Sequence, residues 1–321
     1  MIESTRQASS VSGASENWTF SHLLSPGDVV HGHKLLGQMQ VASGESDLWL
    51  AESPEGKRVV KFYRHGVIPL AMPAVAHPNL MPVIARGLHE DRHYEITPLM
   101  KGSLQDCLKI KPLQEADLYR LLEQLLGAVH VLHERGVQHR DIKPSNILMD
   151  ENGGFFLSDL GSAGLSSNTC LTCPRNTLLY SAPEAITGIY SKASDWWSVG
   201  MVLLESVLGQ HPLQHLSGSS LFLRLSTGQV DIPSLPGNWG QIVHGLLEPD
   251  HTKRWNESTI RQWIAGTLPK TSRRFPGAQL FGLLALVLPV MIRFTPLAFL
   301  AACICAGLSG YFVFRASRTC P

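Results

Sequence analysis

The sequence predicts an α+β fold in which a small, strand-rich N-terminal part precedes a larger, helical C-terminal part. Two observations predict it: short β-branched runs fall before residue 64, and helical periodicity dominates after residue 115. With 321 residues, the chain is long enough for one large two-part domain. Its net charge of +1 provides no basic field, so we expect no nucleic-acid partner.

The strands are expected at residues 34–36, 48–51 and 58–63. The third strand has the β-branched pair Val59 and Val60 beside a single lysine, Lys61. Residues 1–25 are rich in serine and polar residues and contain no apolar core, so we expect a disordered polar leader and not a signal peptide.

The first long helix is expected at residues 116–133, where one stripe is apolar at Leu118, Leu121, Leu122, Leu125, Val129 and Leu132. Gly136 stands where a helix C-cap is expected. The apolar runs 147–149 and 155–157 flank a polar, glycine-containing turn and predict a hairpin. A second buried helix is expected to begin near Asp195 and to continue through residue 208.

Four motifs follow one another in a fixed order. Residues 139–146 are HRDIKPSN, residues 158–161 are SDLG, residues 177–184 are TLLYSAPE, and Arg254 lies further downstream. In this order and spacing, residues 26–267 resemble eukaryotic-like serine/threonine protein kinases of the bacterial type. The resemblance implies a bilobal protein-kinase-like fold with a kinase domain at residues 26–268, and ATP and Mg²⁺ as cofactors.

The same resemblance assigns roles to residues of the second lobe. Asp141 takes the position of the catalytic base, and Lys143 is placed to steady the transferred phosphate. Asn146 and Asp159 are the expected magnesium ligands and also bind the nucleotide, because a hard cation prefers carboxylate and amide oxygens. Arg254 is expected to form a buried ion pair with Glu184 that fixes the substrate-binding shelf.

The nucleotide is also expected to contact the first lobe. Lys61 matches the strand lysine that contacts the α- and β-phosphates. Gly44 and Ser46 belong to a loop that we expect to cradle phosphate, although serine or valine occupies its usual glycine positions; the alternative is a simple hairpin turn. Glu95 opens a segment, residues 95–100, that resembles the interlobe hinge.

One stretch departs from the kinase pattern. Residues 62–76 contain no aspartate or glutamate, and two prolines interrupt them, so the usual acidic helix is not expected there. Lys61 then either remains mobile or pairs with another acid, for which the candidates are Glu45, Asp47 and Asp159. This departure keeps a second hypothesis open beside an active kinase: a catalytically weak pseudokinase acting as a nucleotide-binding or scaffolding module.

The C-terminal region is predicted to be a membrane anchor. Residues 278–314 are almost free of charge, and as one helix they would be about 55 Å long, against a hydrocarbon core of about 30 Å. We favour a helical hairpin of residues 278–292 and 296–314; the alternative is one span at residues 294–314. The apolar stretch predicts the lipid bilayer as a partner. The basic linker 269–277 and the short basic tail 315–321 predict that both ends lie in the cytoplasm. The kinase resemblance suggests a bacterial inner membrane, with the kinase domain on its cytoplasmic side. No feature identifies the protein substrate.

Overall fold

The computed structural model describes residues 24–40, 46–64, 75–162, 164–165 and 178–268. Contacts divide the chain into the units 1–267 and 268–321, and the fold below is that of the first unit. The predicted leader, linker, membrane segment and basic tail lie outside the described residues, apart from the last residues of the leader. Within the part of the chain that is described, no helix has the length and apolar character needed to cross a bilayer.

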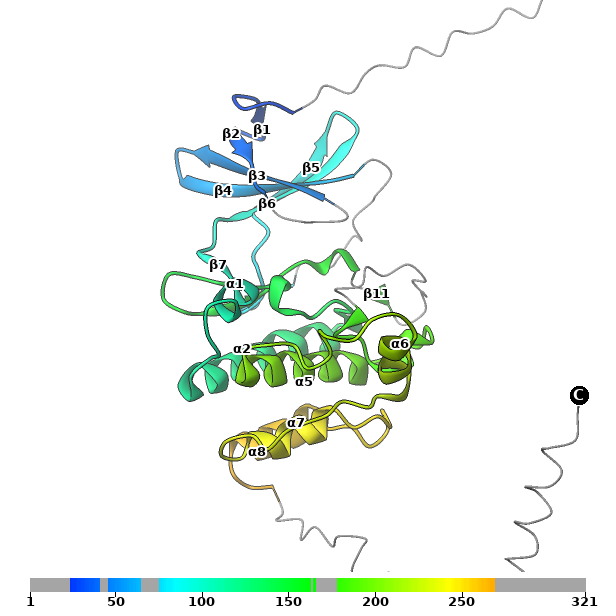
Figure 1. The fold of residues 1–321 in the computed structure, drawn as a ribbon. Helices are drawn as coiled ribbons and strands as arrows, with labels where there is room; N and C mark the ends of the chain where they lie inside the picture. The colour runs from blue at the N-terminus through cyan, green and yellow to red at the C-terminus, as the bar shows by residue number, and fades with distance from the viewer. Residues whose placement is uncertain (1–23, 41–45, 65–74, 163, 166–177, 269–321) are drawn as a thin grey trace, which may run out of the picture. The chain divides into compact units, whose positions relative to one another are not determined.

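The N-terminal lobe is built on a six-stranded antiparallel sheet with the order β1-β2-β3-β4-β6-β5 (Figure 1). Its strands are β1 (Val29–Val30), β2 (His33–Gln38), β3 (Ser46–Ser53), β4 (Gly56–Tyr63), β5 (Ala85–His89) and β6 (Arg92–Pro98). The three predicted strands are therefore confirmed as β2, β3 and β4. Because β6 lies between β4 and β5, Lys61 is directly opposite Glu95, and Glu95 is directly opposite Arg86.

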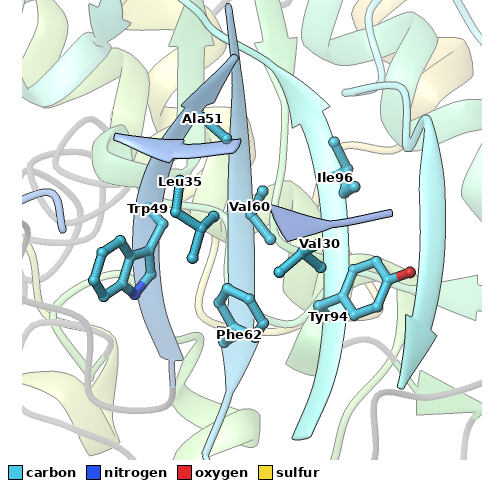
Figure 2. Close-up of a cluster of buried hydrophobic side chains, with 8 residues drawn as sticks. All are labelled: Val30, Leu35, Trp49, Ala51, Val60, Phe62, Tyr94 and Ile96. Atoms are coloured by element: carbon cyan, nitrogen blue, oxygen red, sulfur yellow. The ribbon is translucent and has the colours of Figure 1, made fainter. Parts of the chain in front are cut away.

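One face of this sheet carries a hydrophobic core, which Figure 2 shows as eight side chains. Val60 and Phe62 of β4 are both fully buried in it, and the neighbouring strands contribute Val30, Leu35, Trp49, Ala51, Tyr94 and Ile96. Successive side chains of a strand point to opposite faces. Lys61 and Tyr63 therefore point to the other face of the sheet, away from this core.

The C-terminal lobe is mainly helical. Its helices are α1 (Leu104–Leu108), α2 (Glu115–Glu134), α4 (Pro183–Ile186), α5 (Lys192–Leu208), α6 (Gly218–Thr227), α7 (Trp239–Leu246) and α8 (Glu257–Ile264). Short strands accompany them: β7 (Gly102–Ser103), β8 (Val137–Gln138), β9 (Ile147–Met149), β10 (Phe155–Leu157) and β11 (Gly164–Leu165). Helices α2 and α5 lie side by side (Figure 1).

The predictions for this lobe are confirmed. The apolar stripe of α2 is buried, and Gly136 follows the helix with a left-handed φ of 72°, a conformation that glycine adopts without steric cost. Strands β9 and β10 form the predicted antiparallel hairpin. Helix α5 begins three residues before Asp195, and it packs closely on α7, since a Cβ added to Gly200 would lie 2.8 Å from the Cβ of Leu246.

Candidate active site

The loop after β8 is anchored from α5. Asp195 is 1% exposed, and its two carboxylate oxygens accept the backbone N–H groups of His139 and Arg140, each at 2.9 Å. The Nε2 of His133 donates to the same carboxylate at 2.7 Å. Burial raises the pKa of Asp195, but the hydrogen bond and charge of His133 hold it below its usual value. The ionised carboxylate thus holds Arg140 in a left-handed conformation with a φ of 66°.

Asp141 has one carboxylate oxygen that accepts two hydrogen bonds and one without a partner among the described residues. Its Oδ2 accepts from the Nζ of Lys143 at 2.7 Å and from the Nδ2 of Asn146 at 2.8 Å. Its Oδ1 is buried and has no hydrogen-bond partner among the described residues. A carboxylate that is fixed through one oxygen and free at the other has the geometry required of a general base.

His139 joins this loop to the segment that carries Asp159. The Nδ1 of His139 accepts the N–H of Asp141 at 3.2 Å, so its Nε2 carries the proton and donates to the carbonyl of Ser158 at 2.9 Å. Ser158 in turn donates its N–H and its hydroxyl to the carbonyl of Asn146, at 2.8 and 2.9 Å. These bonds fix Asp159 beside the loop that carries Asp141 and Asn146.

Asp159 is joined to the N-terminal lobe through Lys61. The Nζ of Lys61 lies 2.5 Å from Oδ1 of Asp159, which also accepts the N–H of Gly161 at 3.3 Å. Burial raises the pKa of Asp159, but the ammonium of Lys61 holds it below its usual value. Asp159 is therefore the acid that pairs with Lys61, whereas Asp47 pairs with Arg92 at 2.5 Å and Glu45 lies outside the described residues.

These residues fit a magnesium ion. Magnesium is typically held by one or two carboxylates together with substrate phosphates. Asp159 supplies a carboxylate, and Asn146, which is bonded through its backbone to the residue before Asp159, supplies an amide oxygen. The Nδ2 of Asn146 donates to Asp141, so its amide oxygen is left to face a cation.

Of the residues expected to hold the nucleotide from the first lobe, Ser46 and Glu95 lie within strands and not in the expected loop and hinge. Ser46 begins β3 and is buried opposite Tyr63, and Gly44 lies outside the described residues. Glu95 is not at a hinge: it lies within β6, with a strand on each side, and the chain leaves the sheet only after Pro98. The hinge interpretation of Glu95 is therefore corrected: its backbone is paired with a strand on each side.

The side chain of Glu95 has other partners. Its Oε2 accepts from the hydroxyl of Tyr63 at 2.9 Å, and its Oε1 accepts from the Nε of Arg86 at 2.7 Å. Sequence reasoning missed Tyr63 and Arg86, because their proximity depends on the register of three strands. It also gave Asp195 no anchoring role, although a charged residue within the apolar run of α5 is a signal for a buried polar contact.

The predicted pairing of Glu184 and Arg254 is confirmed. The guanidinium of Arg254 binds both carboxylate oxygens, at 2.6 and 2.9 Å, and its side chain is fully buried. It also stacks over the ring of Trp197 and donates to backbone carbonyls, while Ser194 donates to the carboxylate of Glu184 at 2.9 Å. The end of the 177–184 motif is thereby attached to the C-terminal lobe.

A bilobal fold with this lysine–aspartate pair and this anchored loop defines a protein of the protein-kinase class. The family model described as "Protein kinase domain" matches residues 70–264, which is more than half of the chain. The chain belongs to this family.

Curated relatives are similar over part of the chain. It is 30% identical over 200 residues to CBL-interacting protein kinase 1 of Oryza sativa subsp. japonica, covering 58% of this chain and 42% of that protein. It is 33% identical over 157 residues to CBL-interacting serine/threonine-protein kinase 21 of Arabidopsis thaliana, covering 48% and 38%. It is 37% identical over 134 residues to serine/threonine-protein kinase AtPK1/AtPK6 of Arabidopsis thaliana, covering 41% and 29%. The chain thus spans less than half the length of these relatives.

Proposed function

We propose that this protein is an active serine/threonine kinase that transfers the γ-phosphoryl group of ATP to hydroxyl groups of protein substrates. The observation that carries the proposal is the state of Asp141: Lys143 and Asn146 hold one oxygen, and the other is buried without a partner among the described residues. A substrate hydroxyl that approaches Oδ1 would find a fixed acceptor for its proton. The serine/threonine preference rests on Lys143 and on the similarity to relatives named as serine/threonine-protein kinases.

The residues divide the remaining tasks. Asn146 and Asp159 would hold Mg²⁺, which would neutralise charge on the phosphates. Lys143 lies 2.7 Å from Asp141, so its ammonium would be close to a phosphoryl group transferred to a hydroxyl at this base. Lys61 of the first lobe would contribute its ammonium to the α- and β-phosphates.

The experiment uses the full 321-residue chain, purified in mild detergent. It is incubated with Mg²⁺, labelled ATP and peptides that contain serine, threonine or tyrosine as the only acceptor. We expect label on serine and threonine, and a loss of about 10²–10⁴-fold in Asp141→Asn. Asp117→Asn, on the exposed face of α2, is the matched control and should retain the wild-type rate. Equal rates in wild type and Asp141→Asn would refute the role of Asp141.

The second candidate is the pseudokinase scaffold. It is favoured by the absence of an acid in residues 62–76 and by the use of Asp159 as the partner of Lys61. In the scaffold, MgATP would raise the melting temperature of the chain without any label transfer. Transfer that depends on Asp141 would exclude this candidate.

We also propose that residues 278–314 anchor the protein in a membrane, with the kinase domain in the cytoplasm of a bacterium. The proposal is supported by the nearly uncharged composition of this stretch and by its basic flanks. Expressed in bacteria, the full chain should sediment with inner membranes, and a chain that ends at residue 268 should not. A full chain that stays in the supernatant after lysis without detergent would refute the anchor.

A further inference from the structure

Lys61 lacks the acidic partner that protein kinases usually provide. In the family, the strand lysine pairs with a glutamate on the following helix, and this pairing is required for activity. Here no aspartate or glutamate occurs from residue 62 to residue 76, so the segment after β4 cannot supply that carboxylate. Asp159 pairs with Lys61 instead, but the proposed function also assigns Asp159 to magnesium.

A second carboxylate lies on the same face of the sheet as Lys61. Glu95 is directly opposite Lys61 across the β4–β6 pair, and directly opposed residues in an antiparallel sheet have Cβ atoms about 4.5–5.5 Å apart. Tyr63, two residues beyond Lys61, also points to this face, because the intervening Phe62 is part of the core on the other face (Figure 2). Glu95 and Tyr63 therefore flank the stem of Lys61.

This pair is rigidly held. Each oxygen of Glu95 has its own donor, the hydroxyl of Tyr63 at 2.9 Å and the Nε of Arg86 at 2.7 Å. Only 14% of the Glu95 side chain is exposed, and Tyr63 is buried. Burial, and next the charge of Glu95, raise the pKa of the Tyr63 phenol, so it stays protonated and continues to donate.

The backbone of Tyr63 is held as well, at the point where the chain leaves the sheet. Arg92 donates its Nε to the carbonyl of Tyr63 at 3.1 Å, and its guanidinium also binds Asp47 and lies over the ring of Phe62. The ring of Tyr63 is in turn 4.9 Å from the Nζ of Lys61, within the range of a cation–π contact. The ammonium thus has a fixed aromatic face on its own strand, and Glu95 fixes that ring through its hydroxyl.

We propose that Tyr63 and Glu95 are positioning residues for Lys61, so that the sheet itself supplies the orientation that a helix glutamate supplies in other kinases. When Asp159 binds magnesium, its charge is no longer available to Lys61 alone. The ring of Tyr63, which Glu95 fixes through the tyrosine hydroxyl, remains beside the lysine and would hold its ammonium toward the α- and β-phosphates. This inference rests on the proposed function for the identity of the nucleotide, but not on phosphoryl transfer.

The test is a double-mutant cycle on nucleotide binding, because Lys61 would contact phosphates and not adenosine. Isothermal titration calorimetry on the full chain measures the Kd of MgADP and of adenosine for wild type, Glu95→Gln, Lys61→Met and the double variant. We expect Glu95→Gln to weaken MgADP binding about tenfold and to leave adenosine binding within about twofold. In the Lys61→Met background, Glu95→Gln should have no further effect.

Two further variants sharpen the result. Tyr63→Phe keeps the ring and removes the hydroxyl that fixes Glu95, so it should reproduce part of the loss even if Glu95→Gln lowers the yield of folded protein. Glu52→Gln, an exposed glutamate of β3, is the matched control and should bind both ligands like wild type. Equal weakening of adenosine and MgADP in Glu95→Gln, or the same loss with and without Lys61, would mean that Glu95 is only a structural ion-pair partner of Arg86, and would overturn the proposal.

A phosphoryl-transfer assay distinguishes a failure of the kinase proposal from a failure of the positioning role. If wild type transfers no phosphate but the binding cycle has the expected form, the kinase proposal fails and the positioning role stands. If Glu95→Gln transfers phosphate with the wild-type KM for ATP, the positioning role fails and the kinase proposal stands.

Discussion

The ion pair between Glu184 and Arg254 leads to a prediction of unusual size for a single substitution. The Arg254 side chain has no exposed surface and that of Glu184 is 8% exposed, so neither charge can be solvated if its partner is removed. Breaking a buried pair in this way costs about 3–5 kcal/mol, whereas a neutral replacement of both partners costs much less. We therefore expect Arg254→Met to lower the free energy of unfolding by about 3–5 kcal/mol.

Urea denaturation followed by tryptophan fluorescence measures this loss, since Trp197 lies 5.0 Å from the guanidinium of Arg254. With a slope of about 3 kcal/mol per molar urea, the midpoint should fall by about 1–1.7 M. The double variant Glu184→Gln, Arg254→Met should recover a large part of the loss. The neighbouring Lys253 forms a solvent-exposed pair with Asp250, so Lys253→Met is the control and should move the midpoint very little.

The pH dependence supplies a second measurement on the same pair. Burial raises the pKa of Glu184, but the hydrogen bonds and charge of Arg254 hold it below its usual value. The stabilisation is thus fully present above the unfolded pKa of about 4.3 and is lost as the pH falls through the folded pKa. Arg254→Met should lack this part of the acid sensitivity. A midpoint shift below about 0.3 M, or single-variant losses that simply add in the double variant, would refute the reasoning.

Three further predictions concern other parts of the second lobe. His211 donates to the carbonyl of Leu179 and accepts the N–H of Leu213, and burial lowers its pKa to about 4. Because the unfolded pKa is about 6.5, wild type should lose about 3 kcal/mol more than His211→Gln between pH 6.5 and pH 4; equal acid sensitivity of the two by urea titration would contradict this. Gly200→Ala should lower the free energy of unfolding by about 1–3 kcal/mol despite the better helix propensity of alanine, because the new Cβ meets that of Leu246. The control Gly240→Ala, with open space around it, should be neutral or stabilising, and a similar loss there would remove the packing argument. Asn146→Ala should raise the Mg²⁺ concentration for half-maximal transfer about tenfold or more, and an unchanged requirement would remove Asn146 from the metal site.

The sequence was sufficient for features that depend on local pattern. The apolar stripe of α2, the hairpin of β9 and β10 and the strand around Lys61 all follow from periodicity and turn residues, and each is present. The pairing of Glu184 with Arg254 was predictable because both belong to recognisable motifs. The two motifs identify both residues, whatever the number of residues that separates them in the sequence.

Features that depend on strand register were not predictable in the same way. The local context of Glu95 resembles a hinge, but the sheet order places this residue within a central strand, opposite Lys61. Three acids were candidates for the partner of Lys61, and the choice of Asp159 depends on how the loop near Ser158 is bonded to Asn146. Neither arrangement changes the spacing of apolar and polar residues along the chain, so neither can be predicted from it.

The anchoring of the catalytic loop by Asp195 has a consequence for the order of events during synthesis. The loop is made more than fifty residues before the carboxylate that accepts its N–H groups, and the left-handed backbone of Arg140 is held by that carboxylate. On the ribosome, the N–H groups of the loop therefore lack their carboxylate acceptor until α5 has emerged and packed beside α2. A nascent chain, or one that ends before α5, contains every residue of the HRD motif but cannot hold the loop in this conformation. The loop geometry of the folded protein therefore forms only in chains whose second lobe has folded.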